Sequence, residues 1–140
     1  MLHKSKHSLV KVTDFGLSKL LDSSVHMTSF VGTMTYVAPE VLRNMEVEIY
    51  EYSYKADCWS LGCILFSLLC GSPAFYGPSE YDIKVKIRTG HYAMAHNQWG
   101  HISANAKDLV RRLLEVNPDR RLSTDEILSH SWFAQDPYVV

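Results

Sequence analysis

A 16-residue apolar stretch in the middle of the chain constrains the fold more than any other feature. From Lys55 to Cys70, large apolar side chains would occupy nearly every face of a helix, and Gly71 with Pro73 beyond it would end that helix. A helix that is apolar all round is buried on all sides. Because a membrane span takes about 20 residues, we expect this segment to be the central helix of an α-helical core.

Further helices are predicted around the central one from their caps and apolar stripes. One covers Glu80–Thr89, and another follows Ser103, an N-cap residue ahead of an apolar stripe. A last helix opens at Ser123, where Glu126 stands three residues further on and completes a capping box. Pro39 marks the start of a short additional helix, since proline favours the first helical turn. The sequence therefore predicts a mainly α fold.

The N-terminal part of the chain lacks this helical periodicity. Residues Leu9–Val12 alternate weakly and run into a loop, which predicts a short β element at the N-terminus. From Ser18 to Phe30 the chain is polar and has neither a helical nor a strand period. We therefore expect a mobile loop between the short strand and the helices.

Composition and charge exclude several function classes. With 140 residues, 46% hydrophobic and 21% charged, the chain fits one soluble globular domain or a piece of one. Its 14 basic and 15 acidic residues give a net charge of -1, which argues against an electrostatic nucleic-acid binder. No apolar run reaches the roughly 18 residues of a membrane span. We therefore expect neither nucleic acid nor membrane as a partner, and a nuclear or cytoplasmic location.

Neither the cysteines nor the histidines have the spacing of a metal site. The three cysteines fall in one apolar stretch, which suits reduced core thiols better than a disulfide framework; they are Cys58, Cys63 and Cys70. His91, His96 and His101 recur every five residues, and this spacing puts successive ones about 140° apart on a helix. We expect these histidines to lie on the surface or in loops and to bind no metal.

Five short motifs stand in order along nearly the whole chain. They read DFG at 14–16, GTMTYVAPE at 32–40, DCWSLG at 57–62, PDRR at 118–121 and HSWF at 130–133. In this order they resemble the lower part of the large (C-terminal) lobe of a serine/threonine protein kinase. Within the calmodulin-dependent-kinase group, the chain is most similar to the checkpoint kinase 2 type. The resemblance implies checkpoint or DNA-damage signalling as the family role.

The resemblance implies a magnesium and ATP site at the first motif. Asp14 matches the aspartate that coordinates the magnesium bridging the ATP phosphates. Phe15 packs to set the active or inactive state of the loop, and Gly16 permits the backbone turn. These three residues are the expected cofactor-binding residues. Considered without the resemblance, Asp14 fits a solvated carboxylate at the end of a loop equally well.

The second motif indicates serine and threonine as phosphate acceptors. By resemblance, Thr33 contacts the catalytic aspartate and orients the substrate hydroxyl, whereas tyrosine kinases usually carry a basic residue and a tryptophan there. Ser29 and Thr33 also match family positions that are phosphorylated on activation, so both are candidate regulatory sites. Protein substrates or a kinase partner are the implied binding partners.

Three residues are expected to hold the scaffold and not to react. Glu40 resembles the buried carboxylate of the family, whose partner is an arginine near the C-terminus, and Arg121 is the matching position. We expect a buried ion pair between these two side chains. Asp57 resembles the central-helix aspartate that accepts backbone hydrogen bonds from the catalytic loop.

Several groups that a kinase needs for chemistry have no match in residues 1–140. These are the Gly-rich loop, the phosphate-pairing lysine with its glutamate, and the His-Arg-Asp catalytic loop. Phosphoryl transfer depends on positioning and electrostatics that these groups supply jointly. We expect a partial kinase domain over 1–134, inactive in isolation, and a tail over 135–140. Two interpretations stay open: a truncated or incomplete kinase gene product, or a non-catalytic, kinase-derived interaction module.

Overall fold

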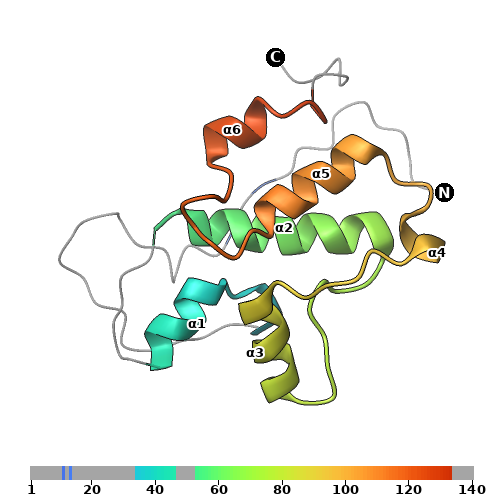
Figure 1. Ribbon diagram of the computed structural model, residues 1–140. Helices are drawn as coiled ribbons and strands as arrows, with labels where there is room; N and C mark the ends of the chain where they lie inside the picture. Colours follow the sequence, from blue (N-terminus) through green and yellow to red (C-terminus); the bar gives the residue numbers. More distant parts are fainter. Residues whose placement is uncertain (1–10, 12, 14–33, 47–52, 134–140) are drawn as a thin grey trace.

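The computed structural model describes Lys11, Thr13 and residues 34–46 and 53–133. Within these residues there are helices and no strand, so the predicted mainly α fold is confirmed. In chain order (Figure 1) the helices are η2 (Met34–Tyr36), α1 (Pro39–Glu46), α2 (Lys55–Cys70), α3 (Glu80–Thr89), α4 (His96–Trp99), α5 (Ala104–Leu113) and α6 (Thr124–Leu128). The predicted strand at Leu9–Val12, apart from Lys11, and the predicted loop from Ser18 to Phe30 lie outside the described residues.

Helix α2 runs through the middle of the molecule, with α5 and α6 on one side and α1 and α3 on the other (Figure 1). Trp59, Cys63 and Phe66 are buried in the larger of two apolar clusters. There the ring of Trp59 stacks on that of Phe75, with 5.3 Å between the centroids. Cys58 faces the second cluster, which α5 and α6 complete. The central helix therefore joins two cores.

One face of α2 is exposed, contrary to the prediction that the helix is enclosed on all sides. Leu61, Ile64 and Leu68 are 45%, 46% and 78% exposed. Their spacing of three and four residues puts them on one stripe of the helix, which we call the α2 stripe. A sequence that is apolar on every face shows that each face of the helix could be buried. It does not show which of these faces the other described helices cover.

The cysteines of α2 are free thiols. Cys58 and Cys63 are buried and Cys70 is half-buried, as the sequence predicts for core thiols. Burial raises the pKa of the Cys58 thiol, and it raises the pKa of Cys63 to about 12. Because the thiolate is the reactive form of cysteine, these two side chains are packing groups and not nucleophiles.

The predicted helix ends are confirmed by their capping geometry. The hydroxyls of Ser103 and Ser123 each accept a hydrogen bond from the backbone N–H three residues on. The Glu126 carboxylate accepts from the Ser123 backbone N–H over 2.7 Å, which completes the capping box. Hydrogen bonds from the Ser123 hydroxyl and N–H lower the pKa of Glu126. Helices α2 and α3 end at Gly71 and Gly90, whose φ angles are 78° and 62°.

The close packing of α2 on α5 depends on Gly62. A Cβ atom at this position would lie 2.8 Å from Leu113 Cβ and 2.9 Å from Leu114 Cδ2. Overpacking of this kind costs about 1–3 kcal/mol, and the better helix propensity of alanine offsets about 1 kcal/mol of it. We therefore expect Gly62→Ala to lower the free energy of unfolding by up to about 2 kcal/mol.

Urea unfolding of the two proteins measures this difference. Leu68→Ala is the matched control, since it changes an exposed side chain of the same helix and should shift the free energy by no more than about 0.5 kcal/mol. An alanine at position 62 that raises the stability would contradict the close approach of the two helices.

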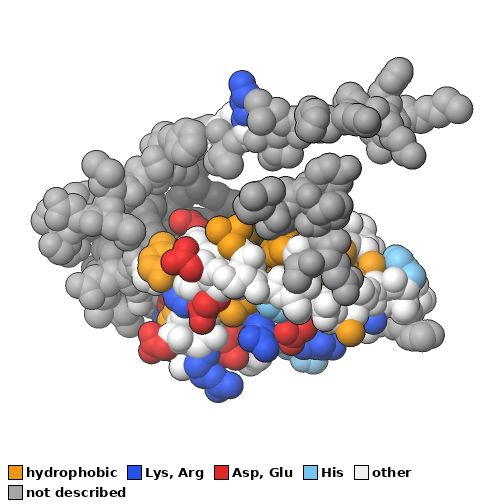
Figure 2. Space-filling model, turned by 90° about the horizontal axis from the view of Figure 1, so that it is seen from above, with side chains coloured by type: hydrophobic (Ala, Val, Ile, Leu, Met, Phe, Trp, Pro, Cys, Tyr) orange, Lys and Arg blue, Asp and Glu red, His pale blue; other side chains and the backbone are white. Residues whose placement is uncertain are grey.

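Charged side chains of both signs are interspersed among the described residues on the face shown in Figure 2. Two ion pairs each join side chains one turn apart on the same helix. Lys84 pairs with Glu80 over 2.6 Å on α3, and Arg112 pairs with Asp108 over 3.0 Å on α5. Exposed pairs of this kind stabilise a fold by at most about 1 kcal/mol. This face therefore has no broad field of one sign, of the kind that steers a polyanion.

Candidate functional site

The predicted residues of the magnesium and phosphate-acceptor sites lie outside the described residues. They are Asp14, Phe15, Gly16, Ser29 and Thr33. Their roles in binding magnesium and ATP, in orienting the substrate hydroxyl and in regulation therefore stay predictions. The part of the candidate site that the structure describes is the anchor at the end of the second motif, built around Glu40.

The predicted ion pair between Glu40 and Arg121 is confirmed. Nη1 of Arg121 donates to Oε1 over 2.7 Å and Nη2 donates to Oε2 over 2.8 Å, so the guanidinium binds both carboxylate oxygens. Arg121 is 1% exposed, and the side chain of Glu40 is 13% exposed. The pair joins residues 81 positions apart. It therefore ties α1 to the loop that precedes α6.

The other donors of Arg121 are also used. Its Nε donates to the Glu115 carbonyl over 2.9 Å. Its Nη1 donates to the Lys55 carbonyl over 2.7 Å, and its Nη2 lies 3.5 Å from the Val116 carbonyl. The guanidinium also lies over the Trp59 ring, 5.1 Å from the centroid. All five N–H groups have an acceptor, which a buried cation requires because an unpaired one is costly.

Lys55 belongs to the same network, although no sequence pattern singles it out. Its Nζ donates to the Arg121 backbone carbonyl and lies 3.9 Å from a Glu126 carboxylate oxygen. Lys55 and Arg121 therefore exchange side chain-to-carbonyl hydrogen bonds in both directions. Only its position in the first turn of α2 could have drawn attention to Lys55. A positive side chain is unfavourable there because the N-terminal end of the helix dipole is also positive, so the side chain needs another partner.

The chain that leads into α1 is fixed at η2. The Ser60 hydroxyl on α2 donates to the Tyr36 carbonyl over 2.9 Å, and the Val37 N–H donates to the Met34 carbonyl over 3.1 Å. Met34 packs against the larger core, and Val37 and Ala38 are buried in it. The segment directly after Thr33 is therefore held from both ends, by η2 on α2 and by the Glu40 pair.

The structure does not bring Asp57 into this network. Asp57 is exposed in the first turn of α2, and none of the described residues donates a hydrogen bond to its carboxylate. Its predicted partners are backbone groups of a catalytic loop that has no match in residues 1–140. The predicted scaffold role of Asp57 therefore stays a prediction.

A cavity of about 650 Å³ lies beside the ion pair. Its lining comes from α1, the start of α2 and the loop after α5, and consists of Glu40, Arg43, Asn44, Ser53, Tyr54, Lys55, Pro118 and Asp119. The only one of these carboxylates inside the network is that of Glu40, and Arg121 occupies both of its oxygens. The arrangement can therefore anchor backbone, but it is not built to take a proton from a substrate.

The part of the chain that the structure describes has neither a cluster of metal-binding side chains nor a membrane-spanning helix. No group of three histidine, cysteine or acidic side chains is placed there to hold a metal ion. No described helix is long and apolar enough to cross a membrane.

Comparison with known proteins gives one family. The family model of the protein kinase domain matches residues 1–133. Calcium-dependent protein kinase 14 of Oryza sativa subsp. japonica is 40% identical over 97% of this chain and 25% of its own length. Calcium-dependent protein kinase 3 of Plasmodium berghei (strain Anka) is 40% identical over 93% of this chain and 23% of its own length.

A third relative, which is not named as a calcium-dependent kinase, is also a protein kinase. The probable serine/threonine-protein kinase fhkD of Dictyostelium discoideum is 42% identical over 94% of this chain and 18% of its own length. The chain thus spans about a quarter or less of the length of these relatives. The comparisons support a serine/threonine kinase and do not single out the checkpoint type.

Proposed function

Because this chain belongs to the protein kinase family, we propose that it serves the ATP- and magnesium-dependent phosphorylation of serine and threonine in protein substrates. It forms the lower, helical part of the large lobe of a kinase domain. The observation that carries the proposal is the bidentate pair of Glu40 with Arg121. Two motifs that are far apart in the sequence supply one partner each, at the positions where the family resemblance expects them.

In this proposal the anchor positions the residues that meet the substrate. The Glu40 pair holds the start of α1, and Ser60 holds the carbonyl of Tyr36. Thr33, directly before η2, would then be placed to orient the acceptor hydroxyl, which is the main requirement of phosphoryl transfer. Asp14 would hold the magnesium ion, which neutralises charge on the transferred phosphate.

The test is a kinase assay on the full-length gene product. We expect phosphate incorporation into serine and threonine peptides, loss of incorporation in Asp14→Asn, and a reduced kcat in Thr33→Ala. Tyr81→Phe is the control, because Tyr81 is 73% exposed on α3 and belongs to none of the five motifs. Incorporation into tyrosine peptides alone, or full activity in Asp14→Asn, would contradict the proposal.

Checkpoint or DNA-damage signalling is the narrower form of this proposal, and a nuclear or cytoplasmic location belongs with it. It rests on the motif resemblance alone, whereas two of the relatives named above are calcium-dependent kinases. The two interpretations differ in their trigger. Phosphorylation of Ser29 or Thr33 after DNA damage and without added calcium would support the checkpoint type, and a strict dependence on calcium would contradict it.

A non-catalytic interaction module is the second candidate function. The observation that favours it is the α2 stripe, because Leu61, Ile64 and Leu68 leave apolar surface exposed of the kind that marks contact with another protein. In that case the chain would bind kinase substrates or a kinase partner without transferring phosphate.

A further inference from the structure

The cavity beside the Glu40 pair is large enough to hold a ligand. Its volume is about 650 Å³, which lies in the range of about 300–1,000 Å³ typical of ligand pockets. A single water molecule takes only about 30 Å³. The walls formed by α1, the start of α2 and the loop after α5 therefore leave room for a short peptide or a molecule of similar size.

Hydrogen-bond donors of the cavity lining are left without an acceptor. They belong to the Arg43 guanidinium and to the hydroxyls of Ser53 and Tyr54, none of which donates to an acceptor among the described residues. The Ser53 oxygen accepts from the Lys55 N–H over 3.2 Å, so its own hydrogen stays available. A guanidinium has five donors and a hydroxyl has one. The lining therefore favours a ligand that brings oxygen acceptors.

Lys55 adds a further donor to the same lining. Its ammonium group has three N–H bonds. One is donated to the Arg121 carbonyl, and Glu126 lies 3.9 Å away on another side. The side chain is 16% exposed, so the ammonium is partly shielded from water and keeps one donor for a ligand.

The charges of the lining leave one positive charge in excess. Arg43 and Lys55 stand against the carboxylates of Glu40 and Asp119, but Arg121 already neutralises Glu40 by binding both of its oxygens. Asp119 forms no ion pair with a cation in the described part of the chain. A ligand with one negative charge therefore matches the cavity, whereas a phosphate group brings a charge of about −1.5 to −2 and would be repelled by Asp119.

We propose that this cavity docks a protein partner through a single peptide carboxylate, from an acidic side chain or a chain end. The Arg43 guanidinium binds both carboxylate oxygens, as planar guanidinium groups do, and Lys55 and the two hydroxyls donate to the same group. Tyr54, which is 44% exposed, and Pro118 supply apolar surface for the rest of the peptide. Asp119 limits the cavity to one negative charge.

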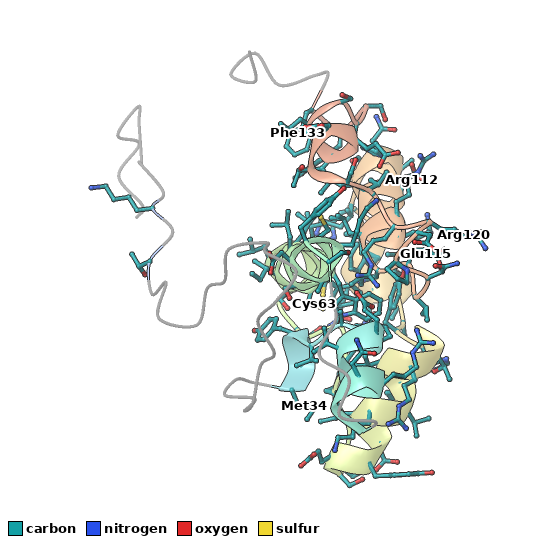
Figure 3. All side chains as sticks on the ribbon, turned by 90° about the vertical axis from the view of Figure 1, so that its left-hand side faces the viewer. Met34, Cys63, Arg112, Glu115, Arg120 and Phe133 are labelled. Atoms are coloured by element: carbon teal, nitrogen blue, oxygen red, sulfur yellow. The ribbon has the colours of Figure 1, made fainter. Side chains whose placement is uncertain are left out.

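Arg120 provides a matched control because it does not line the cavity. It is exposed and directly follows Asp119 in the chain. Figure 3 shows Arg120 at the outer edge of the molecule, pointing away from the helices, with Glu115 at the other end of the same loop. Removing its charge tests the effect of net charge near the cavity without removing a donor from it.

The probe is the peptide Gly-Phe-Glu-Gly-Gly, acetylated and amidated, added to the ¹⁵N-labelled 140-residue chain. We expect the backbone N–H resonances of Ser53 and Lys55 to shift with a dissociation constant on the order of 1 mM. The same peptide with glutamine in place of the glutamate should cause no shift. The glutamine peptide with a free C-terminal carboxylate separates the two sources, because its binding alone would assign the cavity to a chain end.

Two variants with opposite expected signs test the roles of the charges. Arg43→Gln should weaken binding about tenfold, since it removes a hydrogen bond between charged groups. Asp119→Asn should strengthen binding about threefold, since it removes a like charge, and Arg120→Gln should change binding by less than about twofold. Both Arg43 and Asp119 are exposed, and a loss of folding would weaken binding in every variant, so it cannot produce opposite signs.

Three results would overturn the proposal. The first is the absence of any shift with either carboxylate peptide up to about 10 mM. The second is binding of inorganic phosphate as tight as that of the peptides, which would show a general anion site. The third is an Arg43→Gln variant that binds no more weakly than Arg120→Gln.

Discussion

Replacing Arg121 by methionine should lower the free energy of unfolding by about 3–5 kcal/mol. The substitution leaves the Glu40 carboxylate, whose side chain is 13% exposed, without its cation. The carbonyl of Glu115 loses its donor at the same time, and this is part of the loss because an unsatisfied buried acceptor costs about 1–3 kcal/mol. Urea unfolding should therefore show a much lower midpoint with a similar slope.

Two further variants separate the buried pair from ion pairs in general. Lys84→Met removes the pair of Lys84 with Glu80, which is formed over 2.6 Å on the surface of α3, and should cost less than about 1 kcal/mol. Removing both charges of the anchor, as in Glu40→Leu with Arg121→Met, should cost less than the sum of the single changes because no charge is left stranded. If Arg121→Met lowers the free energy of unfolding by no more than Lys84→Met does, the pair of Glu40 with Arg121 is not a structural anchor.

Helix positions are predicted well where local chemistry fixes them. Gly71 ends α2 because its φ of 78° is the left-handed conformation that glycine favours, and Ser103 and Ser123 begin their helices through bonds to backbone three residues on. Helix α4 follows no such pattern. It is a single turn, and one turn is too short to show a period. Its Trp99 is buried, with 4.7 Å between its ring centroid and that of Phe66.

The anchor is predictable for a different reason. Glu40 and Arg121 are 81 positions apart, and neither composition nor periodicity connects them, so only the order of the motifs predicts the pair. Lys55 is not predicted, because its partner is a backbone carbonyl and a backbone group leaves no trace in the sequence. The exposure of Leu68 does not follow from the apolar pattern of α2, since burial depends on which elements pack on a face and not on the face itself.

The isolated chain of 140 residues should transfer no phosphate. A general base must lie within hydrogen-bond reach of the acceptor hydroxyl, and residues 1–140 contain no match to the catalytic aspartate or to the phosphate-pairing lysine. The carboxylate of Glu40 is held on both oxygens by Arg121 and is not free to accept a proton. Asp14 has a magnesium role by resemblance, and magnesium in such sites also takes ligands from a catalytic-loop asparagine and the nucleotide.

The purified chain, mixed with labelled ATP, magnesium and a serine/threonine peptide, should therefore show no incorporation above that of an Asp14→Ala control. Positioned acid–base groups alone contribute about 10²–10⁴-fold to a rate, and the electrostatic clamp on the phosphates contributes more, so the loss should be complete within the sensitivity of the assay. Phosphorylation of Ser29 or Thr33 should not restore transfer, because a new phosphate orders a loop only where an arginine is placed to pair with it. The arginine that does so in the family belongs to the catalytic loop, which has no match in this sequence. Incorporation that Asp14→Ala abolishes would refute the prediction and would require a catalytic group among residues 1–140 that neither the motifs nor the described network supplies.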